Sequence, residues 1–298
     1  MNVRCLLCDV SMLSSLRPQL IGYFQLMRPA AVVIMGFATF VGQVIALKGV
    51  PSLGVSIFPV LASALVTSSS FAVNDYFDYN IDRVNKPGKP IPSGVVPRDR
   101  ALVFGAALFL AGFSASLAAN LSATLLLLIT YGLSLLYNGY AKKTGLLGNI
   151  IVSFSVSMAF VYGSLTAVNS ADPVVLFVAF LSFFINLGRE VVQSIQDMEG
   201  DRVEGVRSVA LVKGPRVAAA LGSAFSAVSL TTAPIVLFFT SDVATPSFLL
   251  IILAEAGFIA SCILLLRKPT KQAASKFIKQ VNIWTVIILT AFLLNTGF

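Results

Sequence analysis

The chain has 298 residues, of which 57% are hydrophobic and only 11% charged, and its mean hydropathy is +0.89. Such values exclude an ordinary soluble domain and are typical of a membrane protein with several spans. The sequence contains no histidine, which excludes imidazole acid–base chemistry and the most common zinc ligand. Its net charge of +8 comes from basic residues between apolar runs, so it indicates membrane topology and does not predict a nucleic acid partner.

The first 27 residues are predicted to be an N-terminal tail that ends in an interfacial helix. Asp9 interrupts the early apolar run, and no small-residue cleavage pattern follows, so the segment does not resemble a signal peptide. Residues from Ser14 to Met27 are expected to form a helix at the membrane surface. Cys5 and Cys8 form a C-x-x-C without a second pair, which does not predict a zinc site.

Nine apolar runs follow, each close to the length of about 20 residues that a transmembrane helix needs. They cover residues 29–47, 53–77, 101–119, 121–140, 148–168, 173–198, 216–239, 246–266 and 278–297. We therefore predict an all-α polytopic membrane protein with nine transmembrane helices, folded as one domain over residues 1–298. Cys262 lies within an apolar run and is expected to pack there, and Glu255 is expected to face either a neighbouring helix or a cavity.

Basic residues predict the orientation in the membrane. Nineteen of the twenty-one lie on one side of the predicted spans: Arg4, Arg17, Arg28, Arg83, Lys86, Lys89, Arg98, Arg100, Lys142, Lys143, Arg202, Arg207, Lys213, Arg216, Arg267, Lys268, Lys271, Lys276 and Lys279. Under the positive-inside rule this side is cytoplasmic. The N-terminus is then inside the cell and, with nine spans, the C-terminus is outside.

The second run leads into the stretch NDYFDYNIDRVNKPGKPIPSG, residues 74–94, where acids recur at helical spacing. Asn74, Asp78 and Asp82 are spaced by four residues, with Asp75 beside the first, so a continuing helix would place them on one face. Like charges at this spacing repel, unless a cation such as Mg²⁺ binds between them and substrate phosphate oxygens. The alternative is a solvated helix end followed by a charged loop.

Cations come directly after these acids, on a loop stiffened by Pro87, Pro90 and Pro92. Arg83, Lys86 and Lys89 would be held there in a restricted arrangement. Carboxylates for a metal followed by cations for an anion predict a phosphate or diphosphate site.

The sixth run carries a second polar stripe, in which Arg189, Gln193, Asp197 and Asp201 recur at every fourth residue. Ionisable groups inside a span are costly and usually face a cavity, although an Arg189–Glu190 pair would also stabilise helix packing. If both stripes face one cavity, two Mg²⁺ ions bridged by a diphosphate would neutralise them. The fourth run ends in Tyr137 and Lys142, with Asn149 just beyond; these are either site residues or interface anchors.

Together these motifs resemble the UbiA superfamily of intramembrane prenyltransferases. The resemblance rests on Arg28–Pro29, the pattern N-D-x-x-D-x-x-x-D from Asn74, the segment from Tyr137 to Lys142, and D-x-x-x-D at Asp197 and Asp201. It implies a ring of nine helices around a central chamber, capped on the cytoplasmic side by the loops after the second and sixth helices. It also implies an Mg²⁺-dependent enzyme that ionises an allylic prenyl diphosphate, so that the carbocation alkylates a lipophilic acceptor.

Within the superfamily the sequences of these motifs are most similar to those of the archaeal digeranylgeranylglyceryl phosphate synthases, which transfer a geranylgeranyl group to geranylgeranylglyceryl phosphate. Gln196 differs from the sequence of those synthases, in which an acid is expected at this position. An aromatic acceptor such as a quinone precursor remains open, as does, from another class, a secondary transporter. A phosphate-bearing acceptor would need further cations, for which Lys89, Lys143, Arg207 and Lys213 are the candidates.

These patterns assign three sets of site residues. The metal ligands are Asn74, Asp78, Asp197 and Asp201. The catalytic residues are Asp75, Asp82, Tyr137 and Arg189. The substrate-binding residues are Arg28, Arg83, Lys86, Lys142, Asn149, Gln193 and Arg202.

Overall fold

The structure is a computed structural model and describes residues 17–239 and 245–295, without the side chains of residues 230–239, 245, 292, 293 and 295. Every regular element in this part of the chain is helical, as predicted. The Cys5–Cys8 pair, the first residues of the predicted interfacial helix and the last residues of the ninth run lie outside the described residues.

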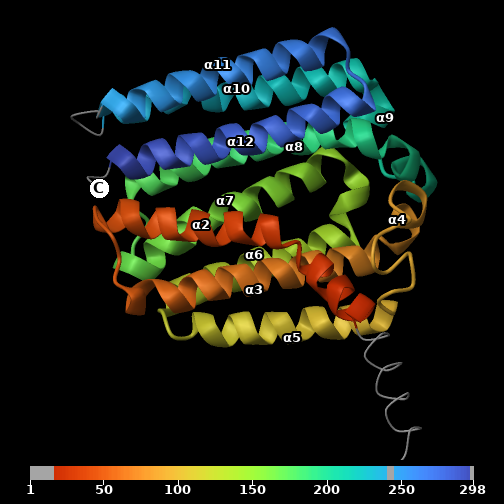
Figure 1. Ribbon diagram of the computed structural model, residues 1–298, viewed down its shortest axis with the longest axis horizontal. Helices are drawn as coiled ribbons and strands as arrows, with labels where there is room; N and C mark the ends of the chain where they lie inside the picture. The colour runs from red at the N-terminus through yellow and green to blue at the C-terminus, as the bar shows by residue number, and fades with distance from the viewer. Residues whose placement is uncertain (1–16, 240–244, 296–298) are drawn as a thin grey trace, which may run out of the picture.

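Long helices run side by side through the molecule (Figure 1). They are α2 (Pro29–Leu47), α3 (Leu53–Phe77), α5 (Arg98–Ser116), α6 (Leu121–Gly139), α7 (Leu146–Val168), α8 (Pro173–Glu204), α10 (Pro215–Phe239), α11 (Thr245–Arg267) and α12 (Lys271–Asn295). Each predicted apolar run falls on one of these helices. The short elements α4 (Tyr79–Asn85), η1 (Ala141–Thr144) and α9 (Val209–Lys213) connect them.

Seven helical segments in the described part of the chain are long and apolar enough to cross a membrane. They include residues 17–47, which form two helices separated at Arg28, and they do not include α10 or α12. Three lysines in the first turns of α12 lower its apolar character: Lys271, Lys276 and Lys279. The protein is therefore an all-helical, multi-pass membrane protein.

Local signals explain where several helices begin. Pro29 and Pro173 occupy the first turns of α2 and α8, where a missing amide hydrogen costs nothing. Asp172 caps α8 by accepting hydrogen bonds from the amides of residues 174 and 175, and Asn120 caps α6 in the same way through Ala123.

Close helix crossings hold the bundle together near the end opposite α4. At the α2–α7 crossing, a Cβ on Gly163 would lie 2.0 Å from the carbonyl oxygen of Thr39, and one on Gly42 would lie 2.1 Å from that of Phe160. Glycine is needed at both positions because the backbones of the two helices touch. Side chains around this crossing form the largest buried apolar cluster described, which also includes residues of α8, α11 and α12.

At the other end of the bundle lie the short helices α4 and α9 (Figure 1), and α4 packs against α8. The helix of residues 17–27 packs Leu26 against Ile91 and Val96, so it covers the loop that follows α4. This end of the molecule is where the polar motifs meet.

Candidate active site

The first acidic motif crosses a break between two helices without losing its common face. α3 ends at Phe77 and α4 begins at Tyr79, with Asp78 between them. The amide of Asp78 still donates to the carbonyl of Asn74, and that of Asp82 to the carbonyl of Asp78, both at 2.8 Å. The predicted face of Asn74, Asp78 and Asp82 is therefore confirmed.

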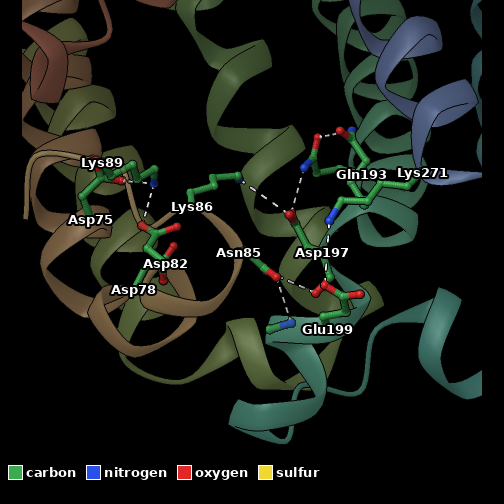
Figure 2. A network of polar contacts seen from close by, with 12 residues as sticks. Asp75, Asp78, Asp82, Asn85, Lys86, Lys89, Gln193, Asp197, Glu199 and Lys271 are labelled. Carbon is green, nitrogen blue, oxygen red and sulfur yellow. Dashed lines mark hydrogen bonds and ion pairs between the residues drawn. The ribbon is translucent and has the colours of Figure 1, made fainter. Parts of the chain in front are cut away.

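Asp75 and Asp82 share one lysine. The Nζ atom of Lys89 lies 2.8 Å from Asp75 Oδ1 and 2.6 Å from Asp82 Oδ2 (Figure 2). Arg28 Nη2 lies 2.5 Å from the same Asp75 oxygen. Both carboxylates are only 3% exposed. Burial raises the pKa of Asp82 above its ordinary value; Lys89 opposes this rise, and the negative charges of Asp75 and Asp78 add to it. Lys89 thus neutralises a buried acid pair.

Asn74 and Asp78 have different partners. The side-chain Nδ2 atom of Asn74 donates to Asn138 Oδ1 at 2.8 Å, and Lys142, from η1, donates a hydrogen bond to Asp78 Oδ1. Together these contacts bring the predicted Tyr137–Lys142 segment against the first acidic motif. The remaining Asn138 amide nitrogen is buried without a hydrogen-bond partner.

The second motif lies on α8, which continues through Glu204 and therefore carries the whole stripe on one unbroken helix. Gln193 donates to Asp197 Oδ2 at 2.7 Å, while Lys86 Nζ approaches the other Asp197 oxygen at 3.6 Å (Figure 2). Asp201 is buried. Arg189 pairs with Glu190 at 2.8 Å, as the packing alternative expected, but its Nε atom is buried without a partner.

One cavity of about 740 Å³ joins the two motifs. Its polar end is lined by both acidic stripes and by the cations near them: Arg28, Asn74, Asp78, Asp82, Lys86, Lys89, Tyr137, Lys142, Asn149, Arg189, Gln193, Asp197 and Asp201. Its deeper part is mainly apolar, with Met35, Val66, Leu127, Phe160 and Leu289 among its walls. The two stripes, 107 to 127 residues apart in sequence, thus face one space, which is the condition under which two Mg²⁺ ions and a diphosphate would neutralise them.

Several predicted residues lie elsewhere. Arg83 and Arg202 are exposed and do not line the cavity; the Arg83 guanidinium lies 5.6 Å from the centre of the Tyr79 ring instead. The geometry therefore does not support their predicted role in substrate binding. Lys143, Arg207 and Lys213 are also exposed and outside the cavity, so three of the four cations suggested for an acceptor phosphate are not at the site. Asp75 touches Arg28 and Lys89 but is not part of the cavity wall.

Two residues were missed by the sequence analysis. Asn138 lies within the predicted Tyr137–Lys142 segment and was assigned no role, although it contacts Asn74. Asn85 lies three residues after Asp82, on the same side of α4, and reaches the backbone of α8. Its spacing continues the acidic stripe by one further turn, which was the available signal.

The oxygen donors suit a hard cation such as Mg²⁺. Asn74 and Asp78 supply an amide and a carboxylate on one wall, and Asp197 and Asp201 supply two carboxylates on the other. In the described part of the chain no three acids converge as a ready metal cluster. Such sparse protein ligation fits Mg²⁺, which takes one or two carboxylates and completes its shell with water and phosphate oxygens.

The chain is similar to known proteins over most of its length. The chain is 30% identical to the digeranylgeranylglyceryl phosphate synthase of Pyrococcus abyssi over 276 residues, covering 92% of this chain and 96% of that protein. It is also 30% identical to the synthase of Methanothermobacter thermautotrophicus over 246 residues, or 80% and 85% of the two chains.

Solved structures share the fold. A digeranylgeranylglyceryl phosphate synthase structure, 27% identical, superposes with a TM-score of 0.73 over 93% of this chain and 98% of that one. A UbiA homologue from Archaeoglobus fulgidus bound to DMAPP and Mg²⁺ is 17% identical and superposes with a TM-score of 0.69, covering 92% and 99%. The model of the UbiA prenyltransferase family matches residues 35–286, and the chain therefore belongs to this family of prenyl-transferring enzymes.

Proposed function

We propose that this enzyme transfers a geranylgeranyl group from its diphosphate to the free hydroxyl of geranylgeranylglyceryl phosphate, at the cytoplasmic side of the cell membrane. The observation that carries the proposal is the single cavity in which two acidic motifs and several cations lie above a mainly apolar chamber. A prenyl diphosphate has this same division between a polyanionic head and an apolar tail. The acceptor is inferred from the relatives of this chain in Pyrococcus abyssi and Methanothermobacter thermautotrophicus, which are digeranylgeranylglyceryl phosphate synthases.

We infer that the site uses Mg²⁺, with two ions held by Asn74 and Asp78 on one wall and by Asp197 and Asp201 on the other. When bound, the metal stabilises negative charge on the departing diphosphate. Support comes from the donor chemistry of these residues and from the family, in which a UbiA homologue binds Mg²⁺ together with DMAPP.

The chain's own cations orient the leaving group. Lys142 and Lys86 approach one carboxylate of each motif, and Arg28 lies beside Asp75, so all three ring the polar end of the cavity. Charged donors held in a water-poor site stabilise developing charge more strongly than the same donors in water. We assign Arg28, Lys86 and Lys142 to diphosphate binding, and Asn149 and Gln193 to substrate contacts at the same wall.

The bond changes need no strong base. The allylic C–O bond of the donor breaks with its electron pair leaving on the diphosphate; the acceptor hydroxyl oxygen then bonds to that carbon and loses its proton. The apolar chamber keeps water from competing for the carbocation. Tyr137 and Arg189 both line the cavity; Tyr137 is proposed to contact the reacting groups, and Arg189 the acceptor. Asp75 and Asp82, predicted to be catalytic, are proposed here to act through Lys89, which they hold at the cavity wall.

The acceptor's phosphate requires a cation that the two acidic motifs do not already neutralise. Arg189 meets this requirement in part, because it faces the cavity and keeps an unpartnered buried Nε atom despite its pair with Glu190. We therefore move the proposed acceptor-phosphate contact from the exposed Lys143, Arg207 and Lys213 to Arg189.

We also propose the finer architecture that the family resemblance implies. α10 and α12 would complete a ring of nine membrane-spanning helices in one domain, with the segments after α3 and α8 forming a cytoplasmic cap. The N-terminus would lie inside the cell, the C-terminus outside. Support comes from the distribution of basic residues and from the position of α4 and α9 at one end of the bundle (Figure 1).

The test supplies the purified enzyme with labelled geranylgeranyl diphosphate, Mg²⁺ and one acceptor at a time, and identifies the products by mass. The acceptors are geranylgeranylglyceryl phosphate, its dephosphorylated form and a hydroxybenzoate. We expect rapid ether formation with the phosphate, slow reaction with the dephosphorylated lipid and none with the aromatic compound. Equal or faster turnover of the hydroxybenzoate would replace the lipid acceptor by an aromatic one. Absence of any Mg²⁺-dependent product would contradict the proposal as a whole.

A further inference from the structure

Asn85, the last residue of α4, binds the backbone of α8 between the two acids of the second motif. Its Oδ1 atom accepts a hydrogen bond from the Gly200 amide at 3.0 Å, and its Nδ2 atom donates to the carbonyl oxygen of Asp197 at 3.4 Å (Figure 2). Asp197 and Asp201 lie three residues before and one residue after Gly200 on the same helix. The contact therefore joins α4 directly to the turn that carries the second motif.

Gly200 allows this contact by leaving space. A Cβ at this position would lie 2.2 Å from Asn85 Nδ2 and 2.9 Å from Ile81 Cγ2, distances that no real contact shows. Gly200 lies inside α8 without a positive φ angle, so its requirement is steric and not conformational. Any larger residue would displace the Asn85 amide from its contact with the α8 backbone or push α4 away from α8.

The contact lies between the two groups of oxygen donors. Asn85 follows Asp78 by seven residues, about two helical turns, and Asp82 by three. Both motifs are carried on helices, so the distance between the α4 and α8 backbones helps to set the distance between their carboxylates. Metal ligands that are carried on two different helices must be held within about 0.5 Å of their productive geometry for the site to bind and react efficiently.

We propose that Asn85 is a positioning residue for prenyl transfer, which fixes the separation of the two acidic motifs through the Gly200 turn of α8. The inference rests on the proposed function, in which both motifs hold metal and diphosphate. Asn85 does not need to touch the reacting atoms for this role. A purely structural contact would affect folding stability alone, whereas a positioning contact also affects how the two motifs bind a shared ligand.

The experiment compares the full-length Asn85→Ala variant with the wild type and with Asn80→Ala. Asn80 is a matched control because it is an exposed asparagine on the same short helix and does not line the cavity. Binding of Mn²⁺ in the presence of inorganic diphosphate is measured by electron paramagnetic resonance, which needs no turnover. Thermal unfolding without metal and the kinetics of prenyl transfer are measured on the same preparations.

We expect Asn85→Ala to weaken Mn²⁺ binding by about 10- to 100-fold, the range typical of residues that orient metal ligands without binding the metal themselves. Its kcat/KM should fall by a similar factor, while Asn80→Ala matches the wild type. Asn85→Asp keeps the acceptor for the Gly200 amide and should retain most of the affinity. Gly200→Ala should lose affinity as Asn85→Ala does.

Wild-type Mn²⁺ affinity and kcat/KM in Asn85→Ala would overturn the positioning role. Asp197→Asn is measured in parallel: if this variant keeps its activity and its Mn²⁺ affinity, Asp197 does not hold metal. If the wild type itself forms no Mg²⁺-dependent product, the proposed function fails, independently of Asn85. If Asn85→Ala does not fold, metal binding by Asn85→Asp and Gly200→Ala tests the proposal instead. Equal and normal metal binding by these two variants would then refute the inference, and weak binding by Gly200→Ala with near-normal binding by Asn85→Asp would support it.

Discussion

Lys89 contacts two buried carboxylates, Asp75 and Asp82, and its own side chain is only 21% exposed. Removing one partner of a buried ion pair leaves an uncompensated charge in a poorly solvated place, which costs much more than a surface pair contributes. The charge balance of the site thus depends on Lys89, which the sequence predicted as a candidate for binding the acceptor phosphate.

Lys89→Met is expected to lower the free energy of unfolding by about 3 kcal/mol at neutral pH. Its pH dependence follows from Asp82, whose pKa burial already raises and whose pKa would rise further without Lys89. A carboxyl with a folded-state pKa above its unfolded value binds its proton more tightly when folded, so stability falls as pH increases through that interval. The defect should therefore be largest at neutral pH and shrink as pH falls toward the ordinary aspartate pKa of about 4.

Thermal unfolding in detergent between about pH 4 and pH 8 measures this defect. Lys86→Met is the control, because Lys86 is half exposed and lies 3.6 Å from its carboxylate. A Lys89→Met defect that does not change with pH would show that Asp82 is not the group responsible.

Lys142 and Arg83 were both predicted to bind the diphosphate, and the structure separates them. Lys142 lines the cavity and contacts Asp78, whereas Arg83 is exposed and does not line the cavity. Lys142→Ala is expected to lower kcat/KM by about 100-fold or more, the usual effect of losing a charged donor at a developing anion. Arg83→Ala should stay within a few-fold of the wild type. Steady-state kinetics with saturating Mg²⁺ compare them, and equal losses would mean that the cavity does not define the diphosphate site.

At the scale of elements, the apolar runs predicted where the long helices lie, because each run is bounded by prolines, glycines or charges. The predicted face of Asn74, Asp78 and Asp82 also holds, since helical hydrogen bonds continue through the break at Asp78. The spacing of residues in the sequence does not determine which side of a short helix faces the neighbouring helices. α4 turns Asn85 and Lys86 toward α8 and leaves Arg83 in solvent, and only the packing of α4 against α8 determines this choice.

The α2–α7 crossing gives a prediction about element packing. Gly163→Ala places a Cβ 2.0 Å from the Thr39 carbonyl oxygen, which belongs to the backbone and cannot rotate away. We expect a loss of about 2 kcal/mol in stability, in the range of overpacked cores. Gly132→Ala is the control, because it lies in α6 with nothing within 4 Å of its added Cβ. Alanine there should be neutral or stabilising by up to about 1 kcal/mol. Equal unfolding temperatures for both variants would show that the two helices separate easily.

The charge distribution of the whole molecule is uneven along the bundle. The loop after α4 carries Lys86 and Lys89 within a stretch of five basic residues from Arg83 to Arg100, while the loop between α2 and α3 carries Lys48 alone. One loop precedes α3 and the other comes after α4, and the two lie at opposite ends of the molecule (Figure 1). This asymmetry is the basis for placing the site on the cytoplasmic side.

Cysteine labelling tests that orientation directly. Gly88→Cys and Gly49→Cys place one thiol in each loop; an added side chain meets nothing within 4 Å at either position, and neither residue has a positive φ angle. The background replaces Cys5, Cys8 and Cys262 by serine so that no other thiol reacts. A membrane-impermeant maleimide should label position 49 in intact cells and leave position 88 unlabelled, and inverted membrane vesicles should give the opposite pattern. Permeabilised cells should label both, which controls for thiol reactivity. Labelling of position 88 in intact cells would place the polar end of the cavity outside, where the proposed lipid acceptor and its diphosphate donor could not be supplied from the cytoplasm.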